Sequence, residues 1–228
     1  MTSVIAITNI AGGTFKTTTA HALTVASVEY GKKVLLIDLD PRADLTFTLG
    51  FEKSRETIVE ILSGSGLSQS NDITTDERFD FIGTDSRLSV QNDVKSLKSA
   101  LELLPRKYDL VIIDTPSQID SRLAIALMAA QTILVPTNAS IHGIRGAVST
   151  LKIGSDCKKF ILPVGPFDTE HAKLFENEII VDAHIPLTTG IDLAVSQKRS
   201  MLSTDKNSDF ASAYREAAYS LLEHLNHF

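Results

Sequence analysis

The chain of 228 residues lacks tryptophan, has a single cysteine (Cys157), and contains only 6% aromatic residues. One cysteine cannot form an internal disulfide or supply the ligands of an iron–sulfur cluster. This usage favours a reducing compartment, so we expect the protein in the cytoplasm. No stretch approaches the ~20 consecutive apolar residues that cross a bilayer. The first residues also lack the basic segment that precedes the apolar part of a signal peptide.

Acidic residues are in modest excess over basic ones, so the formal net charge is −6 at pH 7. This excludes a protein whose whole surface attracts nucleic acid. It leaves a local basic patch open, since salt confines surface electrostatics to roughly 10 Å. Hydrophobic residues make up 43% of the chain and charged residues 22%, which predicts a packed core.

Short apolar runs rich in β-branched residues alternate with stretches of helical pattern. The run at 34–37 is apolar at every position, which is typical of a parallel strand covered by helices on both faces. We predict one nucleotide-binding domain over 1–228, an α/β fold with a doubly wound, mostly parallel sheet flanked by helices. A surface loop is expected over 63–77. The predicted strands are 4–7, 34–37, 79–82, 110–113, 132–135 and 160–162, and the predicted helices are 16–29, 90–104, 123–130 and 208–225.

A glycine-containing turn follows the first strand and leads into a helix that begins at Lys16. Glycines let backbone N–H groups close around phosphate oxygens, and the helix N-terminus favours negative charge. In such a loop Lys16 would reach the β- and γ-phosphates, and the Thr17 hydroxyl would bind Mg²⁺. The alternative is an ordinary glycine turn into a helix capped by threonine. The candidate nucleotide-binding residues are Gly12, Gly13, Thr14, Phe15, Lys16, Thr17 and Thr18.

Two further strands end in aspartates. The second strand runs into Asp38-Leu39-Asp40-Pro41, and the strand at 110–113 is followed by Asp114. With the glycine turn, these motifs resemble the ParA/MinD family of deviant Walker A P-loop ATPases, and the resemblance spans nearly the whole chain. The resemblance implies that Asp40 positions the attacking water, that Lys16 stabilises the phosphates, and that Thr17, Asp38 and Asp114 lie at Mg²⁺. Turn formation by Asp38 and Asp40, and helix capping by Asp114, are the structural alternatives.

The phosphate loop departs from the family pattern at two positions. The family's signature lysine falls at Ala11, so its contact across a nucleotide-sandwich dimer cannot form here. The glycine before the loop lysine is replaced by Phe15, which costs on the order of 1–3 kcal/mol if an unusual φ is retained. Arg42 stands where glutamine is usual; contact with phosphate or a partner and plain solvation are both open. Nucleotide binding is expected to survive better than hydrolysis.

The resemblance implies a dimer formed on ATP that partitions a plasmid or chromosome region or positions other cargo, released by a ParB-like or other adaptor. The resemblance also implies non-specific DNA binding through basic residues, for which a solvated polar face is the alternative. The C-terminal segment is not basic enough for membrane binding. One alternative is a hydrolysis-deficient regulator or scaffold on the same fold. Another is a metabolic P-loop enzyme resembling dethiobiotin synthetase. The candidate DNA-binding residues are Lys198, Arg199, Lys206 and Arg215.

Overall fold

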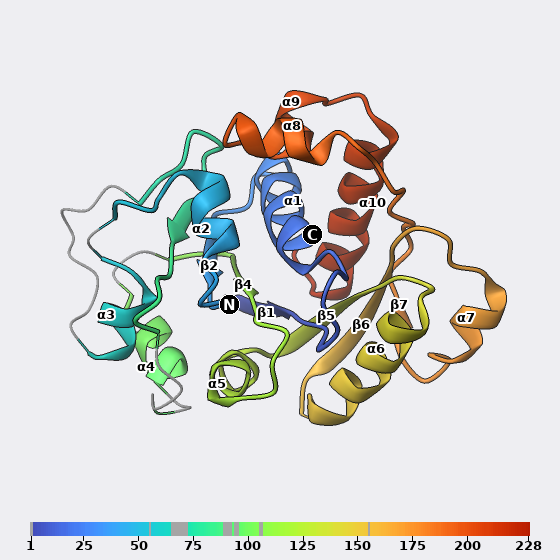
Figure 1. The fold of residues 1–228 in the computed structure, drawn as a ribbon, viewed down its shortest axis with the longest axis horizontal. Coiled ribbons are helices and arrows are strands. Elements are labelled where there is room, and N and C mark those ends of the chain that lie inside the picture. Colours follow the sequence, from blue (N-terminus) through green and yellow to red (C-terminus); the bar gives the residue numbers. More distant parts are fainter. Residues whose placement is uncertain are drawn as a thin grey trace.

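Seven parallel strands form a single sheet at the centre of the molecule, in the order β3-β2-β4-β1-β5-β6-β7 (Figure 1). The computed structural model describes residues 2–54, 56–64, 73–88, 93, 96–104, 107–154 and 156–228. The strands are β1 (Ser3–Ile7), β2 (Val34–Asp38), β3 (Asp80–Ile82), β4 (Leu110–Asp114), β5 (Thr132–Thr137), β6 (Lys158–Pro163) and β7 (Ile179–Ile180).

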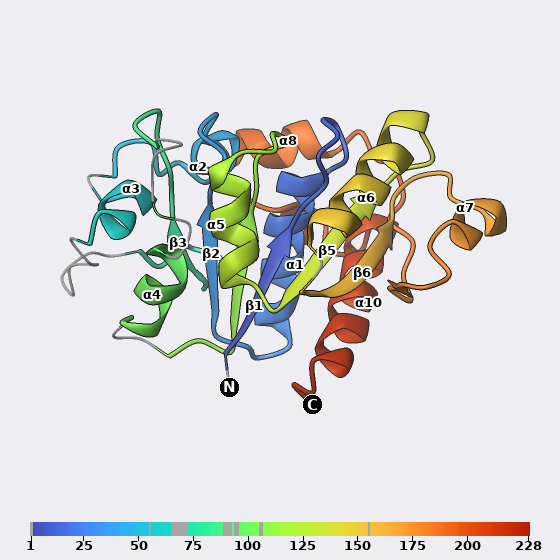
Figure 2. The same ribbon diagram turned by 90° about the horizontal axis from the view of Figure 1, so that it is seen from below.

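Helices cover both faces of this sheet (Figures 1 and 2). Helices α1 and α10 pack on one face with α2 and α9, whereas α3, α4, α5 and α6 pack on the other. The helices are α1 (Lys16–Glu29), α2 (Asp44–Leu49), α3 (Ile58–Leu62), α4 (Ser96–Glu102), α5 (Ser121–Ala129), α6 (Ile141–Ile153), α7 (Thr169–Lys173), α8 (Ile191–Ser196), α9 (Met201–Thr204) and α10 (Asp209–His224).

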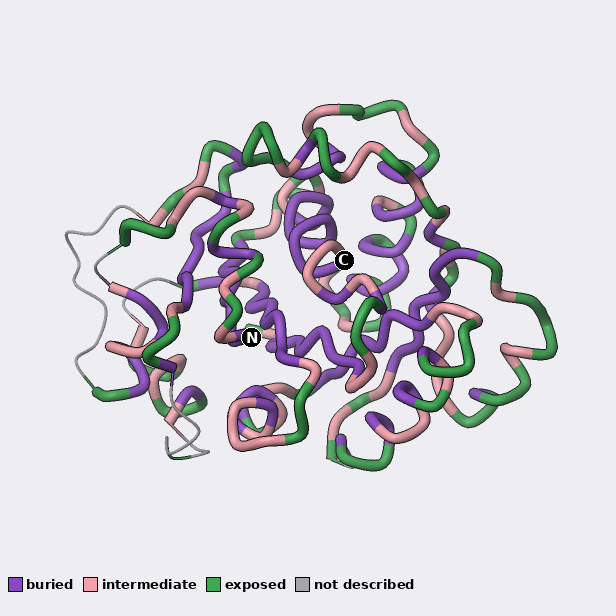
Figure 3. Tube along the Cα trace, in the orientation of Figure 1, coloured by how far each residue is buried: buried purple, intermediate pink, exposed green. Residues whose placement is uncertain are grey.

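The central strands are buried along their length (Figure 3). In β2, Val34 and Leu36 enter the core under α1 and α10, whereas Leu35 and Ile37 enter the core under α3 to α6. Because successive side chains of a strand point to opposite faces, each face needs its own apolar set. This explains the uninterrupted apolar run and confirms the predicted doubly wound α/β fold.

Most predicted elements lie where the sequence placed them, with three differences. The helix expected over 90–104 was too long, because Asp93 lies outside the helix and α4 begins at Ser96; residues 90–92 and 94–95 lie outside the described part. Within the expected loop at 63–77, residues 65–72 are likewise not described. Glu77 is buried rather than at the surface, since it contacts His21. Several elements were not predicted, namely helices α2, α3, α6, α7, α8 and α9 and strand β7.

The strand register gathers the candidate residues at one edge of the sheet. Asp114, the last residue of β4, lies level with Ile7 of β1 and with Asp38 of β2. The glycine turn leaves β1 at this edge, and Asp40 follows β2 at the same edge. In Figure 2 the turn between β1 and α1 projects at the opposite end of the molecule from the two chain termini. A candidate site therefore lies at the carboxyl ends of β1, β2 and β4.

Candidate functional site

The glycine turn is fixed at its start by β5 and α6. The Asn9 side chain donates from Nδ2 to the Pro136 carbonyl at 3.0 Å and accepts the Ala11 amide at 3.0 Å. The Ile10 amide donates to Thr150 Oγ1 of α6 at 3.1 Å. A Cβ on Gly146 of α6 would meet Asn9 Oδ1 at 2.4 Å, so glycine is required for this close packing. The first half of the turn is thus held before any ligand binds.

The second half of the turn carries the unusual backbone. Gly13 has φ 70°, and Phe15 has φ 63° and ψ 23°. The sequence-based expectation of an unusual φ at Phe15 is confirmed. A left-handed conformation costs a residue with a Cβ roughly 1–2 kcal/mol. Part of this cost is offset because the half-buried Phe15 ring packs against the core under α1 and α10. The Phe15 carbonyl accepts the Thr19 amide at 2.8 Å as α1 begins.

Lys16 is the first residue of α1 and reaches across the turn. Its Nζ donates to the Ala11 carbonyl at 3.0 Å and to Ser117 Oγ at 2.9 Å. Only 6% of the residue is exposed. Burial lowers the pKa of Lys16, while the charges of Asp114 and Asp40 raise it again in part. The ammonium therefore lies in the concavity of the turn, held by two neutral oxygens that a phosphate could replace.

Asp114 is a buried carboxylate that accepts no hydrogen bond from the described residues. It is 1% exposed, and neither side-chain oxygen has a hydrogen-bond partner among the described residues. Burial, followed by the charge of Asp38, raises the pKa of Asp114 well above its ordinary 3.8. The Thr17 hydroxyl is close enough to favour the charged form but does not reach hydrogen-bonding geometry. Buried polar groups are nearly always satisfied, so this orphaned carboxylate indicates a site for a cation.

The donor atoms of this site suit Mg²⁺. Mg²⁺ prefers oxygen ligands and usually binds one or two carboxylates together with substrate phosphates and water. Asp114 and the Thr17 hydroxyl supply such oxygens. Among the described residues no three His, Cys, Asp or Glu side chains converge as a metal cluster. The residues fit a Mg²⁺ ion completed by nucleotide oxygens better than a self-contained metal site, with Thr17 and Asp114 as the protein's contribution.

Asp38 is engaged by its own neighbours. Its Oδ1 accepts the Asp40 amide at 3.0 Å, and its Oδ2 accepts the amide and hydroxyl of Thr46 at 3.0 and 2.7 Å. Burial raises the pKa of Asp38 to about 7, against the hydrogen bonds from Thr46 and Asp40, which lower it. These contacts tie the end of β2 to α2. The predicted role of Asp38 beside the metal stays a prediction.

Asp40 is also buried, at 4% exposure, and is covered by an arginine. Its Oδ1 accepts the Arg42 amide at 3.0 Å, and Arg42 Nη2 lies 3.2 Å from Oδ2. The Arg42 side chain is 63% exposed and also lies 3.3 Å from Asp44. The carboxylate expected to position water is therefore occupied by a guanidinium.

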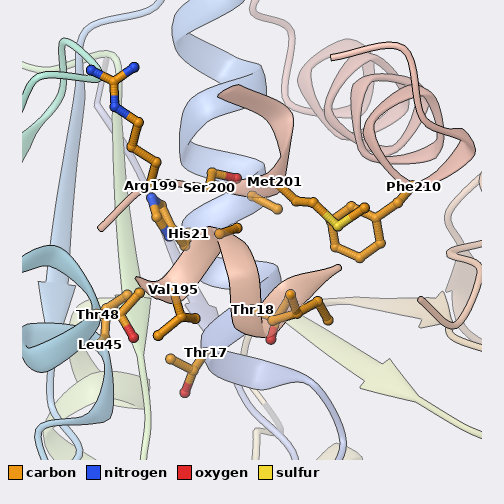
Figure 4. Close-up of a pocket in the computed structure, with 13 residues that line it drawn as sticks. Thr17, Thr18, His21, Leu45, Thr48, Val195, Arg199, Ser200, Met201 and Phe210 are labelled. Atoms are coloured by element: carbon orange, nitrogen blue, oxygen red, sulfur yellow. The ribbon is translucent and has the colours of Figure 1, made fainter. Parts of the chain in front are cut away.

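A small cavity lies behind the phosphate loop, between α1, α2, α8, α9 and α10 (Figure 4). Its volume is about 50 Å³, and Thr17 and Thr18 form part of its wall beside Leu45, Val195 and Met201. A single water needs only about 10–15 Å³ on this measure, so the cavity has room for a few waters but not for a nucleotide. Nucleotide would bind on the open side of the turn.

Two of the four basic residues predicted to bind DNA, Arg199 and Arg215, lie beside acidic side chains. Arg215 Nε lies 2.6 Å from Glu29, and Arg215 Nη1 donates to the Lys206 carbonyl at 2.7 Å. Arg199 lies 3.9 Å from Asp76. Lys198 is exposed with φ 55°. These contacts bring Arg215 and Lys206 together, and their role in DNA binding stays a prediction.

Two contacts of the site region were missed from the sequence. Ser117, three residues after Asp114, binds Lys16, and its position beyond the strand end was a usable signal. The second is a buried contact of His21 Nε2 with Glu77 Oε2 at 2.6 Å. Glu77 also accepts the Ser200 amide at 3.0 Å and thus joins α1 to the start of α9. No sequence pattern links residues so far apart.

A strand, a glycine turn and a helix beginning with Lys-Thr, beside a buried aspartate on the neighbouring strand, define the class of P-loop nucleotide-binding proteins. A family model described as an AAA domain matches residues 2–160. The chain is 32% identical over 158 residues to the sporulation initiation inhibitor protein Soj of Bacillus subtilis. The matched region covers 64% of this chain and 62% of Soj, which is less than two thirds of the relative's length. It is 31% identical over 181 residues to the maintenance of carboxysome distribution protein A of Gloeothece citriformis, covering 72% of this chain and 69% of that protein.

Two solved structures share the fold. The septum site-determining protein MinD of Pyrococcus horikoshii, complexed with Mg-ADP, has a TM-score of 0.84 at 24% identity, covering 99% of this chain and 98% of MinD. Cobyrinic acid a,c-diamide synthase of Mycobacterium smegmatis, with bound ADP and magnesium, has a TM-score of 0.75 at 27% identity, covering 99% and 96%. The chain belongs to the ParA-like family of P-loop ATPases. Among its described residues, no helix is both long and apolar enough to traverse a bilayer.

Proposed function

We propose that the protein binds ATP with Mg²⁺ and acts as a ParA-like, nucleotide-dependent switch that partitions DNA or positions another cargo in the cytoplasm. The observation that carries this proposal is that one site holds both a buried ammonium, Lys16 inside the turn, and the orphaned carboxylate of Asp114. A triphosphate with Mg²⁺ supplies the anion that Lys16 lacks and the cation that Asp114 lacks. Soj and the carboxysome distribution protein are named for roles in regulation and distribution, which agrees with the positioning role.

Titration with ATP in the presence and absence of Mg²⁺ tests this function. Lys16→Ala removes the ammonium and is expected to weaken ATP binding about 10- to 100-fold, the effect of a lost charge-assisted contact. Lys173→Ala is a matched control, because Lys173 is exposed on α7 and pairs only with Glu170 in the described structure. Equal ATP affinity of the parent and Lys16→Ala would show that the loop does not hold phosphate.

Turnover is a separate part of the proposal. Asp40 would orient the attacking water, because phosphoryl transfer depends mainly on positioning and charge stabilisation. A specific observation favours the second candidate, a hydrolysis-deficient regulator: Asp40 is engaged by Arg42. A steady-state ATPase assay separates the two. Turnover that Asp40→Ala abolishes supports the switch, whereas tight ATP binding without turnover supports the regulator.

Partners belong to the same proposal. ATP would join two copies face to face, an adaptor would trigger release, and the four basic residues would bind DNA without sequence preference. Binding to phosphates releases counterions, so retention on DNA should fall steeply with salt. Lys206→Ala is expected to reduce that salt dependence. The diamide synthase shows that the same fold also carries metabolic enzymes, and for such an enzyme no salt-sensitive DNA retention is expected.

A further inference from the structure

Arg42 is the feature of the site that the proposed function leaves without a role. Its guanidinium contacts both oxygens of Asp40, with Nε at 3.4 Å from Oδ1 and Nη2 at 3.2 Å from Oδ2. The two partners differ in exposure, because 63% of the Arg42 side chain is exposed whereas only 6% of the Asp40 side chain is exposed. A buried carboxylate is thus covered by a cation that reaches it from solvent.

Two other segments of the chain show what an Asp-x-Arg segment does elsewhere. Arg87 contacts Asp85, and Arg122 contacts Asp120, in each case with the arginine amide bound to the aspartate two residues earlier. Asp120 caps α5 and Asp85 accepts the Thr57 hydroxyl, so both of those pairs have a local structural use. Local geometry therefore explains how Arg42 meets Asp40, but it does not explain why this pair lies at the phosphate loop.

The position of Arg42 is distinguished by the charges around it. The strand register places the end of β2 beside Asp114, and the Leu39 amide donates to the Asp114 carbonyl at 2.9 Å. The charge of Arg42 acts on Lys16, whose pKa is lowered first by burial and to a lesser extent by Arg42. The pKa of Arg42 is itself raised, first by its hydrogen bond to Asp40 and to a lesser extent by the charge of Asp114. The guanidinium accordingly belongs to the same electrostatic site as the loop lysine and the orphaned carboxylate.

We propose that Arg42 senses the terminal phosphate of ATP, exchanging its contact with Asp40 for the γ-phosphate oxygens and thereby freeing Asp40. A guanidinium fits phosphate and carboxylate equally well in geometry, since its planar fork donates to two oxygens at once. A γ-phosphate carries more charge than the carboxylate it competes with. ADP offers no such oxygens, so Arg42 stays on Asp40 when ADP is bound. This role rests on the proposed nucleotide binding.

Equilibrium binding of ADP and of the non-hydrolysable analogue AMPPNP, each with Mg²⁺, tests the role with the full chain. The quantity measured is the ratio of the two dissociation constants. For Arg42→Gln we expect AMPPNP affinity to fall about 5- to 50-fold, the loss of a charge-assisted contact that is partly open to solvent. ADP affinity should change less than about twofold. Arg87→Gln, the same change in an exposed Asp-x-Arg segment whose arginine pairs with Asp85 and Glu60, should alter neither constant.

Salt provides an independent readout. Screening weakens the contact of a partly exposed guanidinium with phosphate, so the parent's preference for AMPPNP over ADP should shrink as NaCl rises. Arg42→Gln should lose most of that salt dependence. A merely structural role at Asp40 would move neither the ratio nor its response to salt.

The outcomes separate this role from the proposed function. If the parent binds neither nucleotide, both are overturned. If the parent binds both nucleotides and Arg42→Gln leaves the ratio unchanged, the sensing role alone is wrong. Faster ATP turnover in Arg42→Gln at an unchanged ratio would also overturn it, because Arg42 would then act only as a brake on Asp40. Selective loss of AMPPNP affinity with loss of salt dependence supports the exchange.

Discussion

Replacing Asp114 with asparagine should stabilise the nucleotide-free protein. The carboxylate is 1% exposed, its oxygens lack hydrogen-bond partners among the described residues, and Asp38 lies beside it in the strand register. An unsatisfied buried polar group costs about 1–3 kcal/mol, and a charged one costs more. Asparagine removes the charge but leaves an unsatisfied amide, so the variant recovers only the additional cost of burying the charge. We expect a gain of about 1–3 kcal/mol at pH 8.

The gain should depend on pH in a defined direction. The pKa of Asp114 is raised above the ordinary 3.8 by burial and by Asp38. The folded protein therefore holds this proton over a wider pH range than the unfolded chain, and the penalty of the charged form appears as pH rises through the folded pKa. Asp114→Asn should stabilise more at pH 8 than at pH 5. The sign follows from a raised acid pKa, which favours folding at low pH.

Urea unfolding at both pH values, without nucleotide, measures this effect. Since a change of 1 kcal/mol shifts the melting temperature by about 2–4 °C in a domain of this size, thermal unfolding should show a rise of about 2–12 °C. Asp192→Asn, at an exposed position of α8, is the control and should stay within ~0.5 kcal/mol of the parent. The variant should also lose the Mg²⁺-dependent part of stabilisation by ATP. An Asp114→Asn protein no more stable than the parent at pH 8 would refute the reasoning.

Three other substitutions probe the framework of the site. Phe15→Gly should be about 0.5–1 kcal/mol more stable than Phe15→Ala in urea unfolding, because both lose the ring but only alanine keeps a Cβ at φ 63°; equal stability would contradict the strain. Gly146→Ala should cost about 1–3 kcal/mol and weaken ATP binding, since its Cβ would meet Asn9 at 2.4 Å; unchanged affinity in calorimetry would show that the turn does not depend on α6. Glu77→Gln should cost about 1–3 kcal/mol near neutral pH. Burial raises the pKa of Glu77, but the contacts with His21, Ser203 and Ser200 outweigh burial and lower that pKa overall. The stability that these contacts give is therefore present above about pH 4.5 and is lost as pH falls through the folded pKa. A cost of Glu77→Gln that is independent of pH between 3 and 6 would exclude the mechanism.

The sequence predicted the elements whose pattern is local. The apolar run of β2 indicates burial on both faces, and the helix predicted over 16–29 coincides with α1. Helix α6 was missed because Gly143 and Gly146 lower helix propensity. In the structure these glycines let the helix approach Asn138 and the phosphate loop closely. These glycines weaken the helix locally but permit close contacts that only the fold reveals.

The candidate site was predictable in its positions and not in its pairings. The carboxyl ends of parallel strands share one edge of a sheet, so the sequence alone predicts that Asp114 and Asp40 lie near the phosphate loop. The contact of Arg42 with Asp40 depends on the conformation of the turn after β2, where Ala43 has φ 57°. The burial of Glu77 depends on Ser200, 123 residues away in the chain. The contact of Glu77 follows from tertiary packing, which a single sequence does not encode in any short pattern.

The departures of the phosphate loop divide binding from turnover. Ala11 and Phe15 belong to a backbone that is held without ligand, Ala11 by close packing on Gly146 and Phe15 by a ring that packs against the core. Substitutions there should act on nucleotide affinity, because they change the shape offered to phosphate. Arg42 leaves that shape intact and changes which charge Asp40 meets. A protein of this design would bind nucleotide through its backbone and Lys16, and would hydrolyse it only as fast as the γ-phosphate draws Arg42 away from Asp40.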